Sequence, residues 1–202
     1  MLAKYQVPDQ LFVTPGDLFR RYGKFDHRIL RGWIKAGRVR KLRKGLYLGQ
    51  PDYVRCSVDM FTVANRLQTP SYVSFTMGLR YHNLIPEGVF EITSATTRKA
   101  SVFRYRYQRY SYQTLPPKLF FGYEVVPFRG NTYVVAEIEK VLLDVAYVTP
   151  FFEDPGWLYE VRFDDDEMRE NINWVRMYCY ARAMGSERIM RGVEALIREY
   201  DL

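Results

Sequence analysis

The alternation of apolar and polar positions near the start of the chain predicts two short helices. Thr14 provides an N-cap for the first, Pro15 takes the first helical position, and Asp17 lies in the first turn. Asp26 caps a second helix that runs to about Ala36. Because positions advance by about 100° per residue, this second helix has an apolar face and a basic face. The apolar face carries Ile29, Leu30, Trp33 and Ile34, and the basic face carries His27, Arg28, Arg31 and Lys35.

A basic hairpin is predicted directly after these helices. In VRKLRKGLYLG, residues 39–49, two short runs that carry apolar residues are separated by a basic turn that ends at Gly45. The order helix, turn, helix and basic hairpin is that of a winged helix-turn-helix. In such modules the second helix enters the major groove of DNA and the hairpin lies along the phosphates. The alternative is an ordinary amphipathic helix with a solvated charged face, followed by a basic turn.

The rest of the chain mixes helical and strand-like patterns. Helical spacing is found in CSVDMFTVANRL, residues 56–67, and Ser74 is expected to cap a further helix that ends before Pro86. The last helix is expected to start at Ser186 and Glu187. Between these helices lie strand-like residues 89–97 and 101–112, a pair of strands around 129–131, a helix over EIEKVLLD at 137–144, and helical residues from Asp166 onward.

We therefore expect an α+β protein with two modules. Residues 1–52 form an N-terminal winged helix-turn-helix, and residues 53–202 form a mixed module of a small antiparallel sheet packed with helices. The segment GQPDY, residues 49–53, carries a glycine and a proline just past the hairpin and is expected to be an exposed junction. A fragment of residues 1–52 is accordingly predicted to keep its DNA affinity.

Charge is unevenly distributed along the 202 residues, whose net charge is +7. Residues 1–55 hold 13 Lys and Arg against 4 Asp and Glu, whereas residues 147–202 hold 7 against 12. A basic head on a body with an acidic tail favours a module that binds a polyanion. Because 48% of the residues are hydrophobic and 16% are aromatic, the chain can also bury a core.

The sequence lacks the marks of several other kinds of protein. Cys56 and Cys179 lie far apart without a Cys-x-x-Cys motif, and there are only two histidines, so we expect neither a disulfide framework nor a structural zinc site. No Gly-rich phosphate loop is found, and no cofactor is expected. The N-terminal MLAKYQVPDQ has no apolar signal core, and no stretch approaches the ~20 apolar residues of a membrane span. We expect a cytoplasmic protein that does not contact the membrane.

Three blocks of sequence follow one another in an order that matches a known family. The first runs from Gly37 through Tyr47 across the predicted wing. The second is YVSFTMGLRYHNLIPE, a Ser-led helix with an apolar-Pro exit. The third is FFGYEVVPFRGNTYVVAEIEKVLLDVAY, in which strand, hairpin and strand precede a helix. That helix has the pattern Ala-x-x-Glu-Lys-x-Leu-Leu-Asp, at Ala136, Glu139, Lys140, Leu142, Leu143 and Asp144.

Together these blocks resemble the AbiEi family, which comprises antitoxins and transcriptional regulators of bacterial type IV toxin–antitoxin systems. The resemblance touches much of residues 14–147, whereas residues 148–165 match nothing in the family pattern. We expect the family's usual first helix to be short or missing here, because only MLAKYQV precedes Pro8. The resemblance implies that the C-terminal module opposes a nucleotidyltransferase-type toxin.

Two groups of acidic residues are weighed as catalytic or metal sites. Glu137 and Glu139 with the adjacent Lys140 suggest a metal-dependent nuclease, but the Glu-x-Lys spacing is wrong and no Asp lies between Asp59 and Asp144. A helical Glu/Lys face, either solvated or in a salt bridge, is the better interpretation. The run of Asp at 164–166 lacks the spaced ligands of a calcium loop and is interpreted as a helix start.

The two histidines, His27 and His82, have no evident nucleophile as a partner in the sequence. Each is interpreted as a groove-facing or core residue instead of a catalytic base. We therefore predict no catalytic residue, no metal ligand and no enzymatic activity.

An aromatic run leaves two interpretations of residues 101–112. Phe103, Tyr105 and Tyr107 alternate with arginines, which resembles a base-stacking platform for single-stranded RNA. A sheet face buried under helices produces the same alternation. Because the arginines would lie on the opposite face of the strand, too far to bind the same nucleotides, we favour the buried core.

The sequence as a whole predicts a DNA-binding transcriptional regulator, a repressor whose head binds its own operator and whose body acts as an antitoxin. The expected partners are double-stranded DNA and a cognate toxin. The alternative is a non-enzymatic adaptor for protein or RNA with a basic winged-helix head. The residues predicted to contact DNA are His27, Arg28, Arg31, Lys35, Arg38, Arg40, Lys41, Arg43, Lys44 and Tyr47.

Overall fold

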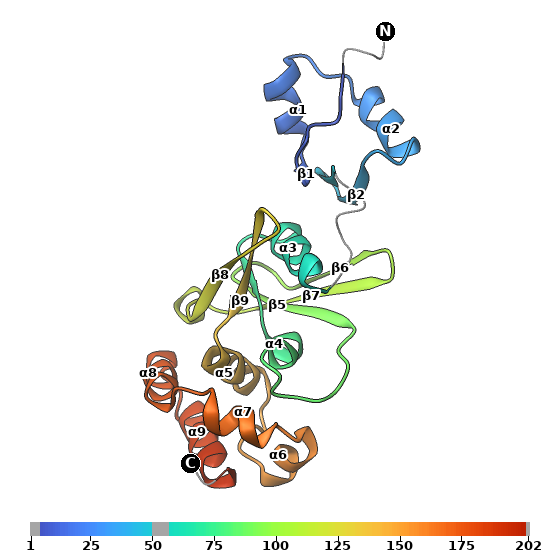
Figure 1. Cartoon of the computed structure of the whole chain (residues 1–202). Coiled ribbons are helices and arrows are strands. Elements are labelled where there is room, and N and C mark those ends of the chain that lie inside the picture. The colour runs from blue at the N-terminus through green and yellow to red at the C-terminus, as the bar shows by residue number, and fades with distance from the viewer. Residues whose placement is uncertain (1–4, 50–56, 201–202) are drawn as a thin grey trace.

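Three parts follow one another along the length of the molecule in the computed structural model (Figure 1). A small head lies at the N-terminal end, a β-sheet in the middle, and a group of helices at the C-terminal end. The structure describes residues 5–49 and 57–200, with side chains for 5–49 and 60–200. Helices and strands are both abundant, so the predicted α+β class is confirmed.

The two head helices begin where the sequence predicts. Helix α1 (Pro15–Tyr22) is capped by Thr14, whose hydroxyl accepts a hydrogen bond from the Asp17 N–H at 3.2 Å, while the Asp17 carboxylate accepts one from the Thr14 N–H at 2.8 Å. This reciprocal pair is a capping box, which satisfies two N–H groups at the helix start. Helix α2 (His27–Lys35) is capped by the Asp26 carboxylate. Both predicted N-caps are confirmed.

The head also contains a small antiparallel sheet. Its strands are β1 (Phe12–Val13), β2 (Arg40–Arg43) and β3 (Leu46–Leu48), in the order β1-β3-β2. Gly45 has φ +78° in the turn between β2 and β3, a conformation that glycine adopts without a steric penalty, and the predicted hairpin is confirmed. Residues 5–11 contain no helix. The buried cluster of the head consists of Val13, Leu18, Leu30, Trp33 and Val39.

The body contains a six-stranded mixed sheet with the order β6-β7-β5-β4-β9-β8. The strands are β4 (Ser71–Val73), β5 (Glu91–Thr96), β6 (Ser101–Tyr105), β7 (Gln108–Thr114), β8 (Tyr123–Phe128) and β9 (Asn131–Ala136). Two pairs, β5 with β7 and β4 with β9, are parallel, and the others are antiparallel. The predicted small antiparallel sheet is therefore wrong for this module. Parallel strands need long connections, so local patterns do not reveal their pairing.

Residues 101–112, which were expected to form one strand, form a hairpin instead. Strand β6 ends at Tyr105, and the chain turns at Arg106, whose φ is +55°. Tyr105 is buried and Phe103 is half-buried, but Tyr107 is fully exposed. The core interpretation is confirmed for Tyr105, holds in part for Phe103, and is wrong for Tyr107, because the turn carries its side chain away from the sheet.

Helices cover both faces of the six-stranded sheet. Helix α3 (Ser57–Leu67) lies on one face, and α4 (Phe75–Tyr81) and α5 (Ile138–Val148) lie on the other, as Figure 1 shows. Neighbouring residues of β4 illustrate the alternation, since Val73 joins the cluster under α3 and Tyr72 joins the cluster with α5. The predicted helices at 56–67 and 137–144 are confirmed, although residue 56 lies outside the described residues and α5 continues four residues past the predicted end.

Ser74 precedes α4 but does not cap it with its side chain. Its hydroxyl donates instead to Asp144 Oδ2 at 2.7 Å, across the interface with α5. Leaving a fully buried carboxylate without hydrogen-bond donors costs more free energy than leaving the N–H groups of a helix start without a side-chain acceptor. The expectation of a side-chain cap at Ser74 is therefore wrong, although the helix itself is present.

The C-terminal part is helical. Asp164 is the N-cap of α7, which confirms the helix start at 164–166, and Ser186 is the N-cap of α9. A short helix within residues 148–165 had not been predicted, although Asp154 and Pro155 supply its cap and first position. The elements are a short 3-10 turn (Pro117–Leu119), α6 (Pro155–Val161), α7 (Asp165–Glu170), α8 (Trp174–Met184) and α9 (Glu187–Glu199).

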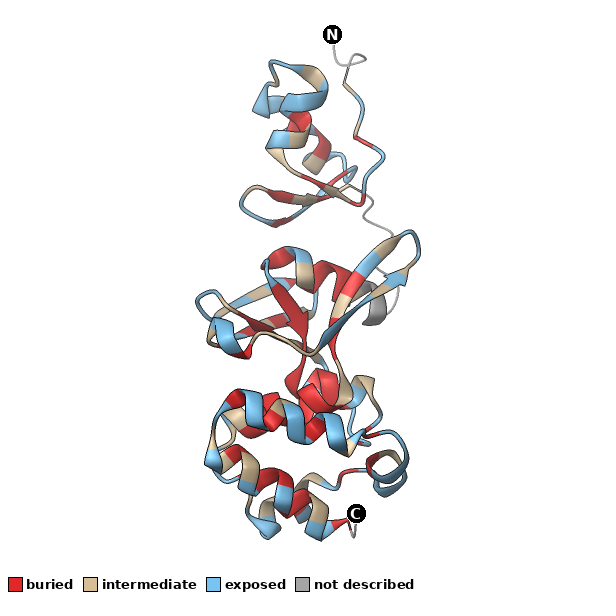
Figure 2. Ribbon diagram, turned by 90° about the vertical axis from the view of Figure 1, so that its left-hand side faces the viewer, coloured by how far each residue is buried: buried red, intermediate tan, exposed pale blue. Residues whose placement is uncertain are grey.

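Head and body share a hydrophobic cluster. Leucines of the small sheet belong to the same buried cluster as residues of α3, and Figure 2 shows buried segments on both sides of this junction. The Arg43 Nε also donates to the Leu67 carbonyl at 2.8 Å. The predicted boundary between 52 and 53, and residues 50–53 of the predicted junction, lie outside the described residues. The shared side chains include Leu11, Leu42, Leu46 and Leu48 of the head and Phe61, Ala64 and Leu67 of α3.

Candidate nucleic-acid interface

Helix α2 separates its apolar and basic residues as the sequence predicts. Leu30 and Trp33 are buried against the rest of the head. Gly32 lies among the basic positions, and a side chain there would meet nothing within 4 Å, so this face is open. The four predicted DNA-contacting residues of the helix, His27, Arg28, Arg31 and Lys35, are all exposed.

The basic side chains of α2 differ in the contacts that they make with other residues of the protein. Arg28 forms an exposed ion pair with Asp26, with Nε 2.7 Å from Oδ2. Backbone and side-chain hydrogen bonds from Arg28 lower the pKa of Asp26, so the cap stays charged at neutral pH. Arg31 and Lys35 form no side-chain hydrogen bond or ion pair with any described residue. A ligand can therefore bind these two side chains without breaking a hydrogen bond or ion pair to a described residue.

The hairpin also separates its apolar residues from its basic residues, as α2 does. Leu42, Leu46 and Leu48 point into the cluster shared with the body, and the basic residues of β2 and the turn are exposed. A β-bulge between Lys41 and Arg43 locally changes the register. Exposed members of the predicted set are Arg38, Arg40, Lys41, Arg43 and Lys44, and Tyr47 is half-buried beside the head cluster.

Arg43 has a different position from its neighbours on the hairpin. Its Nε donates to the Leu67 carbonyl, and its Nη1 donates to the Lys44 carbonyl at 3.2 Å. The side chain therefore ties the hairpin to the end of α3. Lys41 and Lys44 have no such contact with described residues and are the better placed cations for an external ligand.

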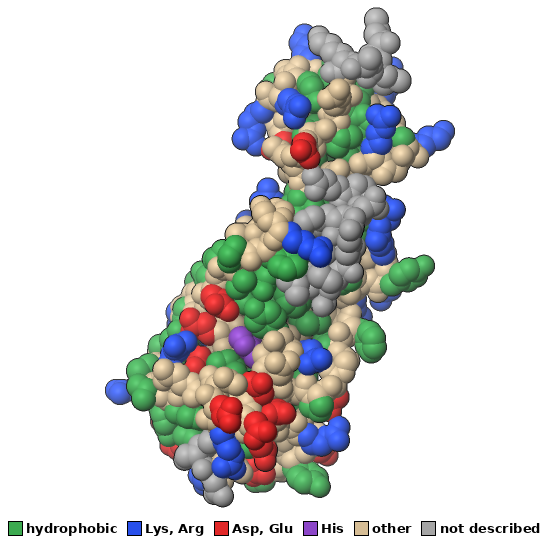
Figure 3. Space-filling model, viewed as in Figure 1, with side chains coloured by type: hydrophobic (Ala, Val, Ile, Leu, Met, Phe, Trp, Pro, Cys, Tyr) green, Lys and Arg blue, Asp and Glu red, His purple; other side chains and the backbone are tan. Residues whose placement is uncertain are grey.

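A hollow of about 480 Å³ continues this basic surface onto the body. Arg43 and Lys44 line it from the head, and Gln68, Arg98 and Phe103 line it from the body. Arg98 was missed by the sequence interpretation, although the Arg-Lys pair at 98–99 follows a strand-like run and marks a basic turn. In Figure 3 Lys and Arg side chains are spread over the head, whereas Asp and Glu side chains gather on the body below it.

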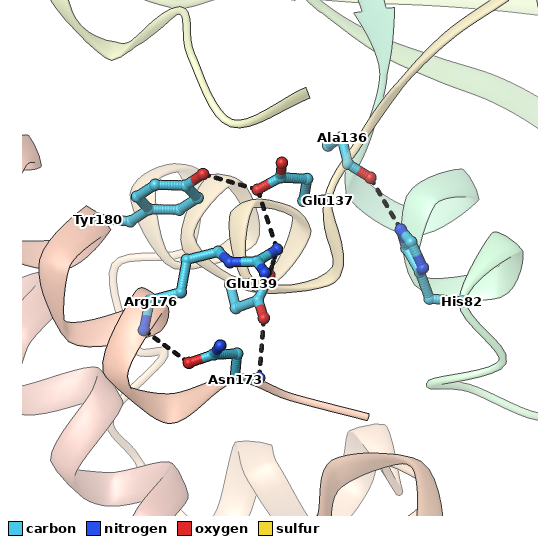
Figure 4. Close-up of polar contacts among 7 residues, drawn as sticks. All are labelled: His82, Ala136, Glu137, Glu139, Asn173, Arg176 and Tyr180. Carbon is cyan, nitrogen blue, oxygen red and sulfur yellow. Dashed lines mark hydrogen bonds and ion pairs between the residues drawn. The ribbon is translucent and has the colours of Figure 1, made fainter. Parts of the chain in front are cut away.

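A second polar group joins α5 to α8 in the body (Figure 4). The Tyr180 hydroxyl donates to Glu137 Oε2 at 2.7 Å, and the Asn173 N–H donates to Glu139 Oε1 at 2.8 Å. Arg176 Nη1 lies 3.5 Å from Glu137 Oε2 and 3.6 Å from Glu139 Oε2. Burial, aided by the bond to Glu137, raises the pKa of Tyr180 to about 12. The two carboxylates thus hold α5 against α8.

Lys140 and Asp144 form a fully buried ion pair one helical turn apart on α5. Asp144 also accepts hydrogen bonds from the Tyr72 hydroxyl at 3.0 Å and from Ser74. The Lys140 ammonium lies 5.6 Å from the centroid of the Tyr72 ring and 5.3 Å from that of Phe121. Of the two interpretations of this face, the salt bridge is confirmed and the solvated face is wrong.

The histidines lie in different environments. His27 is exposed on α2, and His82 is half-buried at the end of α4, with Nε2 2.8 Å from the Ala136 carbonyl oxygen. Burial lowers the pKa of His82, although the carboxylates of Glu124, Glu139 and Glu167 act in the opposite direction. Within the described ranges, no group of three or more His, Cys, Asp or Glu side chains is arranged to hold a metal ion.

Comparisons with known proteins add no family to this description. A scan against models of protein families and a search of curated proteins both return no match for the chain. None of the helices in the described part of the chain is long and apolar enough to cross a membrane.

Proposed function

We propose that this protein is a cytoplasmic transcriptional regulator of the AbiEi type, whose head is a winged helix-turn-helix that binds double-stranded DNA. The observation that carries the proposal is the exposed basic face of α2, which is backed by a buried apolar face and followed by a basic hairpin. An amphipathic helix of this kind fits the major groove, and a hairpin beside it reaches the phosphates. Arg31 and Lys35 are the proposed groove residues.

The wing contributes contacts to the DNA backbone. Lys41 and Lys44 contact phosphates directly, and Arg43 supports them by holding the hairpin on the end of α3. Arg98, which lines the same hollow as Lys44, extends the path of the DNA backbone onto the body. Contacts of this type bind DNA of any sequence, so the preference for an operator comes from α2.

The body is proposed to act by binding, as an antitoxin against a nucleotidyltransferase-type toxin. The support is the sequence resemblance of residues 72–87 and 120–147 to the AbiEi family. The most suggestive carboxylates for catalysis, Glu137 and Glu139, are engaged by Arg176 and its neighbours, which favours a structural role for them. We propose no enzymatic step.

The test is a fluorescence anisotropy titration of the full chain with labelled DNA from upstream of its own coding sequence. We expect the double variant Arg31→Ala/Lys35→Ala to bind far more weakly than wild type. The matched control, Arg169→Ala/Arg198→Ala, removes two exposed cations from the other end of the molecule and should bind normally. Equal affinity of the two double variants would contradict a DNA-binding α2.

A further inference from the structure

A cavity of about 330 Å³ lies at the end of the β6–β7 hairpin, on the face of the sheet that α3 covers. Its size is within the range of sites that bind small molecules, which is roughly 300–1,000 Å³. Aromatic rings and two polar side chains line it: Phe90, Tyr105, Tyr107, Tyr110, Arg106 and Gln108. None of these residues belongs to the proposed DNA interface, and no function has yet been given to them.

The aromatic residues form a buried wall and an exposed rim. Tyr105 pairs with Gln108 and Phe103 pairs with Tyr110, so the rings of Tyr105 and Tyr110 lie on the same face of the hairpin. Both are buried, whereas Phe90 is 89% exposed and Tyr107 is fully exposed at the opening. Large aromatic residues left in water beside an apolar cavity mark a binding surface.

The buried wall contains two hydroxyl groups that have no partner among the described residues. The Tyr105 and Tyr110 hydroxyls are both buried, and neither forms a hydrogen bond with the described part of the chain. Tyr112 follows on the same strand, and its hydroxyl donates to the Ala64 carbonyl at 2.6 Å, so packing under α3 does not in itself prevent such bonds. Buried polar groups of native proteins nearly always have a partner. The two hydroxyls thus have unused hydrogen-bonding capacity beside the cavity.

The rim carries a positive charge in an unusual backbone conformation. Arg106 has φ +55° in the two-residue turn, where glycine or asparagine is usual. Its guanidinium carbon lies 5.6 Å from the centroid of the Tyr105 ring, which is a cation–π contact. The described lining residues include no Asp or Glu. A strained residue that keeps a charge at a cavity mouth is typical of a functional position.

We propose that this cavity binds a nucleobase, stacked on the aromatic residues and hydrogen-bonded by the Tyr105 and Tyr110 hydroxyls, with its phosphate near Arg106. A flat ring matches the aromatic wall, and its polar edge supplies the missing partners of two groups that both donate and accept. A cationic ligand is disfavoured because Arg106, a cation, lies at the rim. The base belongs either to a free nucleotide or to an unpaired nucleotide of a strand.

This activity is separate from duplex recognition by the head. A base inside an intact duplex is stacked and paired, so it cannot enter the cavity. The hairpin variants described below leave the α2 face intact and should bind duplex DNA normally.

The test is isothermal titration calorimetry of the full chain with AMP, GMP, CMP and UMP, and with unstructured ten-nucleotide strands of each base. Tyr107→Ala removes an exposed ring and should weaken binding by about 5- to 160-fold, the range of one stacking contact. Tyr110→Phe removes one hydroxyl but keeps the ring, and should weaken binding by about 2- to 13-fold. The control, Tyr112→Phe, removes a hydroxyl outside the cavity and should leave the affinity unchanged.

The result expected is saturable one-to-one binding of at least one base type that follows this order of variants. Binding of mononucleotides identifies the ligand as a free nucleotide, whereas binding of strands alone identifies it as an unpaired nucleotide of a nucleic acid. The proposal is overturned if no probe binds, or if Tyr107→Ala and Tyr110→Phe bind as wild type does. It is also overturned if Tyr110→Phe markedly lowers stability, because the hydroxyl would then have a partner in the fold.

Discussion

Asp144 is the residue on which the packing of α5 depends most directly. It is completely buried, and it accepts from Lys140, Tyr72 and Ser74, so three different segments meet at one carboxylate. Burial raises the pKa of Asp144 and lowers that of Lys140, while each charge favours the ionised form of the other. Such a pair is strongly destabilising when only one member is removed, because the other charge remains buried alone.

We therefore expect Asp144→Asn to lower the free energy of unfolding by about 3–5 kcal/mol, since it keeps the shape of the side chain but leaves Lys140 unpaired. Urea denaturation at pH 7 measures the change. Glu153→Gln, which breaks the exposed pair with Arg191, serves as the control and should change stability little. A small effect of Asp144→Asn would mean that the lysine finds another partner.

His82 makes stability depend on pH. Because burial lowers its pKa in the folded state, the unfolded chain binds a proton at His82 at a higher pH than the folded chain does. Stability is therefore lost as the pH falls below the ordinary value of 6.5, down to the folded pKa. We expect His82→Gln, whose amide can still donate to Ala136, to flatten this dependence between pH 7 and 5. Identical curves for His82→Gln and wild type would exclude this role.

At the scale of elements, removing a cation from α2 and removing one from the hairpin are expected to change DNA binding in different ways. Arg31 on α2 is proposed to reach base edges, so Arg31→Ala should cost about 1–3 kcal/mol at the preferred site and relax the sequence preference. Lys44 lies in the hairpin turn and contacts phosphate, so Lys44→Ala should weaken binding to all sequences alike. Competition between the preferred site and unrelated duplexes separates the two effects. A loss of preference in Lys44→Ala alone would reverse the assignment.

The elements that could be predicted are those specified by neighbouring residues. Thr14 with Asp17, Asp26, Asp164 and Ser186 each supply a cap within a few positions of the helix that they start, so these helix starts follow from sequence. The order of strands does not follow, because β5 pairs in parallel with β7 across an intervening strand.

Two further differences have local causes. The β6–β7 turn was missed because Arg106 occupies a left-handed position that would normally be marked by glycine or asparagine. The side chain of Ser74 was assigned to a cap because its buried acceptor, Asp144, is 70 residues away in the sequence. The basic residues of the candidate interface could be predicted from periodicity, but Arg98 could not, since only tertiary packing brings it beside Lys44.

At the scale of the whole molecule, the head is joined to the body by apolar contacts. Leu42, Leu46 and Leu48 share a cluster with Phe61 and other residues of α3, so a fragment of residues 1–52 lacks part of the surface that buries them. The predicted fragment can therefore bind DNA alone only if the cluster around Leu18 and Trp33 is enough to keep residues 1–52 folded.

A double-mutant cycle measures this coupling. Leu42→Ala and Phe61→Ala should show an interaction energy of about 0.5–3 kcal/mol in urea denaturation of the full chain, because both lie in the shared cluster. Leu18→Ala, whose leucine lies only in the head cluster, should be additive with Phe61→Ala to within about 0.5 kcal/mol. Strict additivity for Leu42 with Phe61 would show that head and body have separate cores.

The central claim is that the cations of the head bind the DNA backbone, and its most direct test is the salt dependence of duplex binding by the full chain. Each phosphate neutralised contributes about −0.9 to the slope of log K against log salt concentration. We predict a steep negative slope for wild type, and a slope shallower by about one for Lys41→Ala and again for Lys44→Ala, with Arg169→Ala as an unchanged control. Binding that is absent, or whose salt dependence is the same in all four proteins, would contradict the account.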